Sequence, residues 1–167
     1  IEPIQIGILG LGVVGSGTVA LLRQNQHEIE QKVGAPVVVR RIAVRDLHKR
    51  RAVEVDRSLL TKNPTEVVDD PQIQVVCELI GGVSPAREYV LRAIRNGKHI
   101  VTANKELLAK EGHEIMAEAA ARKLDFLFEG SVIAVLGGRL RAAVTRLVAS
   151  ETAAQERESE ARRANEA

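Results

Sequence analysis

The stretch IQIGILGLGVVG, residues 4–15, decides the fold of this 167-residue chain. Its first six residues are uncharged and mostly apolar, which predicts a buried strand over Ile4–Leu9. Glycines follow at positions 10, 12 and 15, and a helical pattern begins at Val13. A G-x-G-x-x-G turn between a strand and a helix is typical of a Rossmann-type dinucleotide-binding unit.

Each glycine of this turn meets a different steric demand. Gly10 permits the tight turn, Gly12 lets a pyrophosphate approach the backbone, and Gly15 lets the helix lie close to the strand. The pyrophosphate would accept N–H groups at the positive end of the helix dipole. We therefore predict that residues 10–15 bind the pyrophosphate of a nicotinamide nucleotide; the alternative is a glycine-rich turn that binds no ligand.

Outward from this unit, apolar segments alternate with helical patterns. Further strands are predicted over residues 36–45, 74–80, 99–103 and 124–128. Helices are predicted over residues 13–32, after the Asn63–Pro64 and Ser84–Pro85 pairs, and on either side of Gly112; Asn63 and Ser84 are the predicted N-caps. The polar segment 46–56 is predicted to be a surface loop. This alternation predicts an α/β fold with a doubly wound, mostly parallel sheet and helices on both faces.

The sequence changes character after Glu129-Gly130-Ser131. From Gly138 to the C-terminus there is no proline and no further glycine, and beyond Ser150 alanine is the only apolar residue among many Glu and Arg. Such a stretch can be helical by propensity but has little to bury. We expect a Rossmann domain over residues 1–136 and a charged helical tail over residues 137–167.

Composition excludes several classes of function. Two Phe, one Tyr and no Trp leave the core to Val, Ile, Leu and Ala, which suits a parallel sheet. A net charge of +2 with interspersed signs gives no case for nucleic acid or membrane as the main partner. The single cysteine cannot form an internal disulfide, and no apolar run approaches the roughly 20 residues of a membrane span. We therefore expect a cytoplasmic protein.

The end of the second strand carries Arg45 and Asp46, where Rossmann units place the group that binds the adenosine ribose. Asp46 suits a free 2′-hydroxyl and Arg45 suits a 2′-phosphate, so the pair leaves NAD and NADP both open. Five more cations lie nearby in the sequence: Arg40, Arg41, Lys49, Arg50 and Arg51. Their charge favours NADP; the alternative is a solvated basic loop.

Later strand ends carry further candidates, because the ligand of a doubly wound sheet lies across the carboxyl ends of its strands. Gly81 and Gly82 would leave room for the nicotinamide ribose. Lys105 is placed to approach the cofactor or a carbonyl substrate; the alternative is a surface lysine without a role in binding.

Glu129 ends an apolar strand and needs a partner such as water or a cation. Glu78 is expected to form a hydrogen bond at the sheet margin and is assigned no role. The four histidines show no metal-ligand spacing.

Four segments together resemble the nucleotide-binding half of homoserine dehydrogenases. They read GLGVVGSGTV from residue 10, GAPVVVRRIAVRDLHKRR from residue 34, CELIGGVSPAREYVLRAIRNGKHIVTANKELLA from residue 77 and DFLFEGSV from residue 125. The combination of ELIGG with GKHIVTANK is more specific than the glycine turn. Members of this family interconvert L-aspartate 4-semialdehyde and L-homoserine with NADPH or NADH, in the biosynthesis of threonine, methionine and isoleucine.

The resemblance implies a role for each matching residue. The implied cofactor ligands are Leu11, Gly12, Val13 and Val14 at the pyrophosphate, Arg45 at the adenosine ribose or its phosphate, Ile80 and Gly81 at the nicotinamide ribose, and Lys105 at the edge of the active site. Glu129 and the backbone of Val132 would help to hold a structural monovalent cation, usually Na⁺. Where the family continues into a glycine-rich stretch with two further backbone ligands, this chain has Ala134 and Leu136.

The resemblance ends there, because nothing after Leu136 resembles the family's substrate and dimerisation domain with its catalytic lysine. No catalytic residue is therefore assigned. Three interpretations stay open: a homoserine dehydrogenase domain that binds cofactor with negligible turnover by itself, a non-catalytic nucleotide-binding or regulatory module that forms a homo-oligomer or pairs with a complementary subunit, and a truncated or frameshifted gene product. A related aldehyde dehydrogenase would need a nucleophilic cysteine, whereas Cys77 lies in the middle of a predicted strand.

Overall fold

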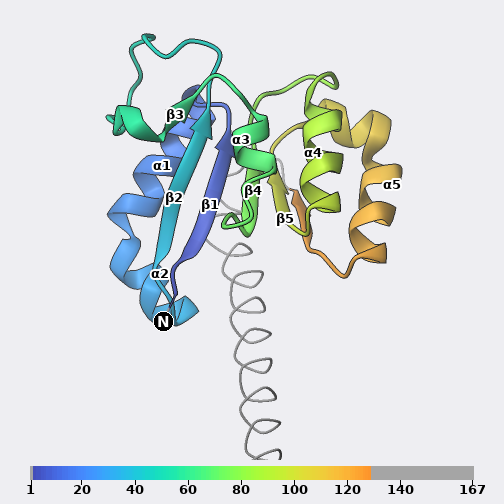
Figure 1. The fold of residues 1–167 in the computed structure, drawn as a ribbon, viewed down its shortest axis with the longest axis horizontal. Coiled ribbons are helices and arrows are strands. Elements are labelled where there is room, and N and C mark those ends of the chain that lie inside the picture. The colour runs from blue at the N-terminus through green and yellow to red at the C-terminus, as the bar shows by residue number, and fades with distance from the viewer. Residues whose placement is uncertain (1, 129–167) are drawn as a thin grey trace, which may run out of the picture.

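Residues 2–128 fold around one six-stranded parallel sheet with helices on both faces (Figure 1). The computed structural model describes residues 2–128. The strands are β1 (Ile4–Leu9), β2 (Val37–Ala43), β3 (Leu60–Thr61), β4 (Val75–Glu78), β5 (His99–Thr102) and β6 (Phe126–Phe128). Their order is β3-β2-β1-β4-β5-β6, and every pairing is parallel. This doubly wound order confirms the predicted α/β fold class.

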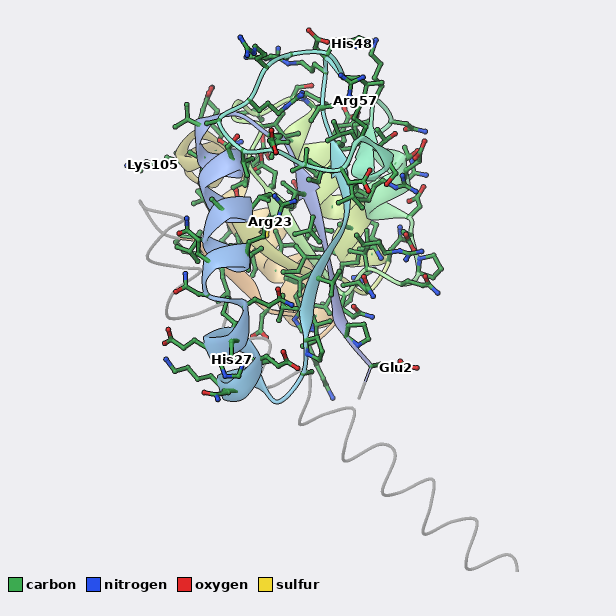
Figure 2. The ribbon with its side chains drawn as sticks, turned by 90° about the vertical axis from the view of Figure 1, so that its left-hand side faces the viewer. Glu2, Arg23, His27, His48, Arg57 and Lys105 are labelled. Atoms are coloured by element: carbon green, nitrogen blue, oxygen red, sulfur yellow. The ribbon has the colours of Figure 1, made fainter. Side chains whose placement is uncertain are left out.

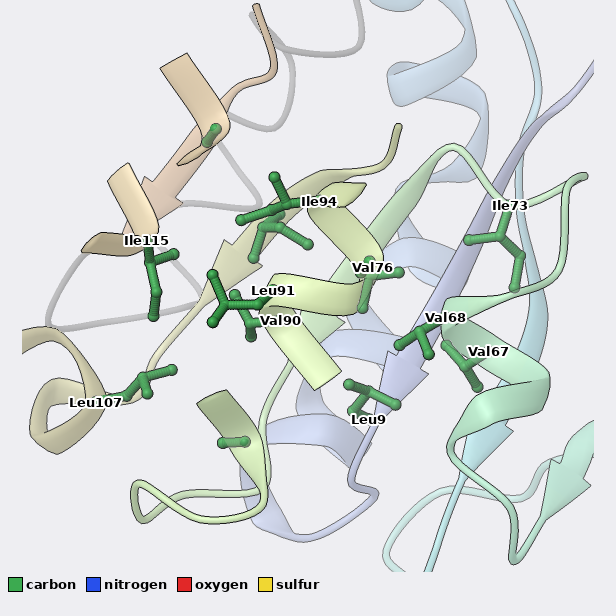
Figure 3. Packing of buried hydrophobic residues seen from close by; sticks show 14 of the residues in the cluster. Leu9, Val67, Val68, Ile73, Val76, Val90, Leu91, Ile94, Leu107 and Ile115 are labelled. Atoms are coloured by element: carbon green, nitrogen blue, oxygen red, sulfur yellow. The ribbon is translucent and has the colours of Figure 1, made fainter. Parts of the chain in front are cut away.

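The helices divide between the two faces of the sheet. They are α1 (Val13–Gln24), α2 (Gln26–Val33), α3 (Thr65–Val68), α4 (Ala86–Arg95) and α5 (Lys105–Ala121), with a 3₁₀ turn over Arg57–Leu59. One buried cluster joins Val19 and Leu22 of α1 to Ile6 and Ile8 of β1. The other, seen in Figure 3, joins side chains of α3, α4 and α5 to the opposite face. Both faces of the sheet are therefore covered.

β1 lies at the centre of the sheet, between β2 and β4, and its sequence suits that position. Ile4, Ile6 and Ile8 enter one cluster and Leu9 enters the other, as alternating side chains of a strand must. Gly7 faces α3 so closely that a Cβ there would lie 2.5 Å from a methyl group of Val67. The predicted bounds of this strand are confirmed.

The helix predicted over residues 13–32 is wrong at one point, because Asn25 divides it into α1 and α2. The Asn25 side chain donates a hydrogen bond to the carbonyl oxygen of Leu21 at 2.9 Å. The Asn25 backbone N–H donates to the same oxygen at 3.0 Å. Asparagine side chains compete in this way with the regular helix and favour its ends.

Other differences concern the ends of elements. β4 stops at Glu78 and not at Ile80, and β6 begins at Phe126 and not at Leu124. The predicted Asn63 cap of α3 is displaced: Pro64 stands at the N-cap without a side-chain cap, and Asn63, one residue earlier, accepts a hydrogen bond from the Thr65 N–H at 3.1 Å. The Ser84 cap predicted for α4 is wrong, since α4 begins without a side-chain cap. The two-residue strand β3 was not predicted. The proposed domain boundary at residues 136 and 137 and the helical tail lie outside the described residues.

Candidate nucleotide-binding site

The carboxyl ends of all strands meet at one edge of the sheet, the upper edge in Figure 1, because every pairing is parallel. Chain connections run in opposite directions from β1 and β4, so the strand order reverses between them. Ligands of open α/β sheets bind in the crevice outside such a switch point. The predicted site residues at the ends of β1, β2, β4 and β5 are therefore brought to the same edge.

The glycine turn has the close packing that its spacing demands. Gly10 has φ +98°, and a Cβ there would lie 2.8 Å from the carbonyl oxygen of Leu79. A Cβ on Gly15 would lie 2.3 Å from the carbonyl oxygen of Gly10. Gly12 differs, since a Cβ there would meet nothing within 4 Å. Neighbouring backbone atoms therefore leave no room for a side chain at Gly10 or Gly15, whereas the space beside Gly12 is open.

The N-terminus of α1 is uncapped within the part of the chain that the structure describes. Gly12 stands at the N-cap, and the first turn contains no acidic residue. The Val13 side chain is 90% exposed and that of Val14 is 44% exposed, whereas Leu11 is buried in the core. The first N–H groups of a helix have no partner inside the helix and form its positive end. They are available to an anion, and Leu11 can contribute only through its backbone.

Arg45 and Asp46 are both exposed just beyond the end of β2. Asp46 Oδ1 accepts a hydrogen bond from the His48 N–H at 2.8 Å, and this bond lowers the pKa of the Asp46 carboxyl. Arg51 closes the same turn by donating to the carbonyl oxygens of Asp46 and Lys49. His48 marks the outer end of this basic loop in Figure 2. One Asp46 oxygen is therefore already engaged by the loop itself.

The segment after β4 turns with two left-handed glycines, Gly81 at φ +80° and Gly82 at φ +72°. Glu78, the last residue of β4, is completely buried. It accepts hydrogen bonds from the N–H groups of Ile80 and Gly81 at 2.8 Å and 3.3 Å. The expected hydrogen bonding of Glu78 is confirmed, but its expected place at the sheet margin is wrong, because β4 lies between β1 and β5.

Lys105 is the first residue of α5 and is exposed, standing clear of the ribbon in Figure 2. Asn104 precedes it as the N-cap and accepts a hydrogen bond from the Leu107 N–H at 3.0 Å. The Asn104 side chain also donates to the carbonyl oxygen of Gly82 at 2.5 Å. These bonds join the start of α5 to the segment after β4, so Lys105 lies beside the predicted nicotinamide end of the site.

Three polar residues of this edge, Glu78, Thr102 and Asn104, were not among the predicted site residues. All three are buried. An asparagine directly before a helical run was a usable signal for Asn104. The predicted cation ligands Glu129 and Val132 lie outside the described residues. Among residues 2–128, no group of three or more His, Cys, Asp or Glu side chains could hold a metal ion.

Cys77 is unsuited to nucleophilic catalysis. It is fully buried in β4, and burial raises the pKa of its thiol to about 12. A thiol of that pKa is not a thiolate near neutral pH.

Within residues 2–128, no helix has both the length and the apolar character that a membrane span requires.

Residues 10–129 match the family model for the NAD-binding domain of homoserine dehydrogenase. The chain belongs to this family. The match begins at the glycine turn, directly after β1, and includes strands β2 to β6. The resemblance of the sequence to the nucleotide-binding half of homoserine dehydrogenases is thereby confirmed.

Individual homoserine dehydrogenases agree with this assignment. The Bacillus subtilis enzyme is 44% identical over 131 residues, which are 78% of this chain and 30% of that protein. A crystal structure from Thiobacillus denitrificans is 51% identical with a TM-score of 0.70, covering 77% of this chain and 30% of that chain. The S. aureus homoserine dehydrogenase is 32% identical with a TM-score of 0.74, covering 78% and 34%. The chain thus spans about a third or less of the length of these relatives.

Proposed function

We propose that this domain binds NADP(H) or NAD(H) across the switch point between β1 and β4. The pyrophosphate lies at the N-terminus of α1, the adenosine half over the end of β2 and the nicotinamide half over the ends of β4 and β5. The observation that carries the proposal is the open N-terminus of α1, where Gly12 leaves space for a ligand and no acidic residue opposes an anion. Helix N-termini of this kind bind phosphate groups.

The proposed ligands at the pyrophosphate are the backbone groups of Gly10, Leu11, Gly12, Val13, Val14 and Gly15. At the other end, Ile80 and Gly81 adjoin the nicotinamide ribose, and Lys105 supplies a cation at the rim. The left-handed backbone of Gly81 and the exposed position of Lys105 support this arrangement. The bound nicotinamide would supply the hydride, and these residues would orient its ring.

We propose NADP as the preferred nucleotide. Within the described residues no carboxylate forms an ion pair with Arg45, which is exposed. Asp46 already accepts the His48 N–H, which leaves it less able to bind both ribose hydroxyls of NAD. A guanidinium group is well suited to a 2′-phosphate.

The reaction proposed for the full-length relatives of this chain is the interconversion of L-aspartate 4-semialdehyde and L-homoserine. In it, this domain would position the nicotinamide, and a substrate domain would bind the aldehyde. We assign no proton donor to residues 2–128, so we expect the 167-residue polypeptide alone to bind nucleotide with negligible turnover. A monovalent cation, Na⁺, remains proposed at Glu129 and Val132.

The decisive experiment is titration of the chain with NADPH and with NADH, followed by nucleotide fluorescence and calorimetry. Gly12→Leu is the test variant, because its side chain would occupy the space proposed for the pyrophosphate. Gly34→Ala, in the exposed turn after α2 and far from the site, is the control. We expect binding by the wild type and the control and none by Gly12→Leu. A wild type that binds neither nucleotide would overturn the proposed function.

A further inference from the structure

Glu78 is a buried acid in a strand whose other residues are all apolar. Its two carboxyl oxygens accept three hydrogen bonds: the Ile80 and Gly81 N–H groups donate to Oε1 at 2.8 Å and 3.3 Å, and the Thr102 hydroxyl donates to Oε2 at 2.6 Å. A carboxyl group that is removed from water needs such partners. The Ile80 and Gly81 N–H groups can only donate, so the position requires an acceptor oxygen.

The hydrogen bonds continue from Thr102 to the start of α5. Thr102 Oγ1 accepts the Asn104 N–H at 3.0 Å, and Asn104 Oδ1 accepts the Leu107 N–H at 3.0 Å. Asn104 Nδ2 donates to the carbonyl oxygen of Gly82 at 2.5 Å. The side chains of Glu78, Thr102 and Asn104, which we call the Glu78 network, therefore link β4, β5 and α5 and close on the segment after β4.

The Glu78 network adds to a sheet whose strands are already paired through their backbones. Backbone pairing joins β4 to β5 from Val75–His99 through Glu78–Thr102. The preceding residues of β4 are already buried in the core. Replacing Glu78 alone leaves its three donors without an acceptor and costs stability, so its effect on binding must be measured apart from its effect on folding. The bonds of Glu78 do orient the Ile80 and Gly81 N–H groups, because both donate to its Oε1 atom.

We propose that Glu78 is a positioning residue for the nicotinamide half of the cofactor. It does not touch the nucleotide; it sets the path of Ile80 and Gly81 and, through Thr102 and Asn104, the start of α5 with Lys105. This inference rests on the proposed function, because it assumes a dinucleotide at the switch point. It predicts that loss of Glu78 impairs binding at the nicotinamide end and leaves the adenosine end intact.

The test compares a whole dinucleotide with its adenosine half. The ligands are NADPH and 2′,5′-ADP, or NADH and ADP if NADH is the ligand that the wild type prefers. The variants are Glu78→Met, which keeps the size but removes all acceptors, Glu78→Gln, and Thr102→Val. The matched control is Val76→Ala, a completely buried position on the same strand whose side chain is apolar. Binding is measured by calorimetry well below each variant's melting temperature.

We expect Glu78→Met to weaken NADPH binding about tenfold while the affinity for 2′,5′-ADP changes less than about twofold. Glu78→Gln and Thr102→Val should show the same selectivity with a smaller effect, because each breaks only part of the network. Val76→Ala should lower the melting temperature without changing the ratio of the two affinities. The bound NADPH of Glu78→Met should also show an altered fluorescence spectrum, since that emission comes from the nicotinamide ring.

If Glu78→Met leaves the ratio of the NADPH and 2′,5′-ADP affinities unchanged, whether or not both affinities fall, the proposed role of Glu78 is overturned. The proposed function stays intact in that case. A wild type that binds neither the dinucleotide nor its adenosine half would overturn both. If Glu78→Met does not fold, Glu78→Gln and Thr102→Val decide the matter. If neither Glu78→Gln nor Thr102→Val changes the ratio of the two affinities, the inference is overturned, as it would be by the same result for Glu78→Met.

Discussion

Single residues of the glycine turn differ in what they demand. At Gly15 a Cβ would meet a backbone oxygen, which cannot rotate away as a flexible side chain can. At Gly12 the backbone has φ −83° and ψ −150°, which any residue can adopt, and the space beside it is open. The two positions therefore separate the demands of the fold from the demands of a ligand.

Gly15→Ala and Gly12→Ala should consequently behave in opposite ways. We expect Gly15→Ala to lower the free energy of unfolding by about 1–3 kcal/mol, because the added methyl forces the turn and α1 apart. Gly12→Ala should change stability by less than about 1 kcal/mol and weaken NADPH binding about tenfold or more. Urea unfolding and nucleotide titration of both variants measure these effects. Equal destabilisation by the two substitutions would contradict the assignment of Gly12 to the ligand side.

Arg45 offers a test of nucleotide preference at one side chain. Arg45→Ala should weaken NADPH binding about tenfold, because a charged hydrogen bond to the 2′-phosphate is lost, and should leave NADH binding unchanged. Arg57→Ala, which removes another exposed cation from the connection between β2 and β3, is the control; Arg57 is labelled in Figure 2. An equal effect of Arg45→Ala on both nucleotides would show that Arg45 does not read the 2′-phosphate.

At the scale of elements, the start of α5 depends on its cap. The Asn104 side chain satisfies the Leu107 N–H and at the same time reaches Gly82. An aspartate in its place keeps the acceptor but has no N–H group for the Gly82 carbonyl. Two substitutions at Asn104 can therefore separate the contribution of its hydrogen bond with Leu107 from that of its hydrogen bond with Gly82.

Asn104→Ala should lower the free energy of unfolding by about 1–2 kcal/mol, since it removes the cap and leaves a buried N–H group without its acceptor. Asn104→Asp should recover part of this loss, because the carboxylate also lies at the positive end of α5. Chemical denaturation measures the free energy of unfolding of the three proteins, which should decrease from wild type to Asn104→Asp to Asn104→Ala. If Ala were as stable as Asp, the Leu107 hydrogen bond would not contribute to stability.

A pH-sensitive contact joins β2 to the segment before β4. Arg40 donates a hydrogen bond to Asp70 Oδ2 at 2.6 Å, and the Gln72 N–H donates to Oδ1 at 2.9 Å. Burial alone would raise the pKa of Asp70, but Arg40, the Gln72 N–H and Lys98 outweigh burial and hold that pKa below its ordinary value of 3.8. A carboxyl group with a lowered pKa in the folded state stabilises the fold above its unfolded pKa and loses this contribution as pH falls through the folded pKa.

We therefore expect wild type and Asp70→Asn to differ in stability by a constant amount above about pH 5, with the wild type the more stable. The difference should shrink as pH falls below about 4, because the wild-type carboxyl becomes protonated. Urea unfolding of both proteins between pH 3 and pH 7 measures it. A difference that persists undiminished at pH 3 would show that charge at Asp70 is not its source.

At the scale of the whole molecule, the sheet with a cluster on each face forms the support, and the nucleotide site lies along one edge of it. Binding at that edge should stabilise the folded state without adding chemistry. At about 100 times the dissociation constant, NADPH should raise the free energy of unfolding of the 167-residue chain by about 2.7 kcal/mol. Thermal unfolding with and without NADPH, beside an assay of aspartate 4-semialdehyde reduction, tests both parts. Reduction at an ordinary enzymatic rate would contradict the proposed division of labour.

How far each element could be predicted depends on how local its causes are. The bounds of β1 follow from contiguous residues, because an apolar run that ends at a glycine turn needs no distant partner to be recognised. Two-residue β3 has no pattern of its own and exists because Leu60 and Thr61 pair with Ile42 and Ala43. The break at Asn25 depends on a competition between side chain and backbone that helical spacing does not register.

The sequence by itself determined the strand of residues 4–9, the glycine turn and the start of the helix at Val13, and with them the fold class; the later segments ELIGG and GKHIVTANK determined the family. These features arise from sterics and periodicity between near neighbours in the chain. Only the tertiary structure decided the environment of Glu78. Two of its hydrogen-bond partners are local, but Thr102 lies 24 residues away on the next strand. Whether a buried acid is an isolated polar group or the centre of a network depends on which strand the fold places beside it.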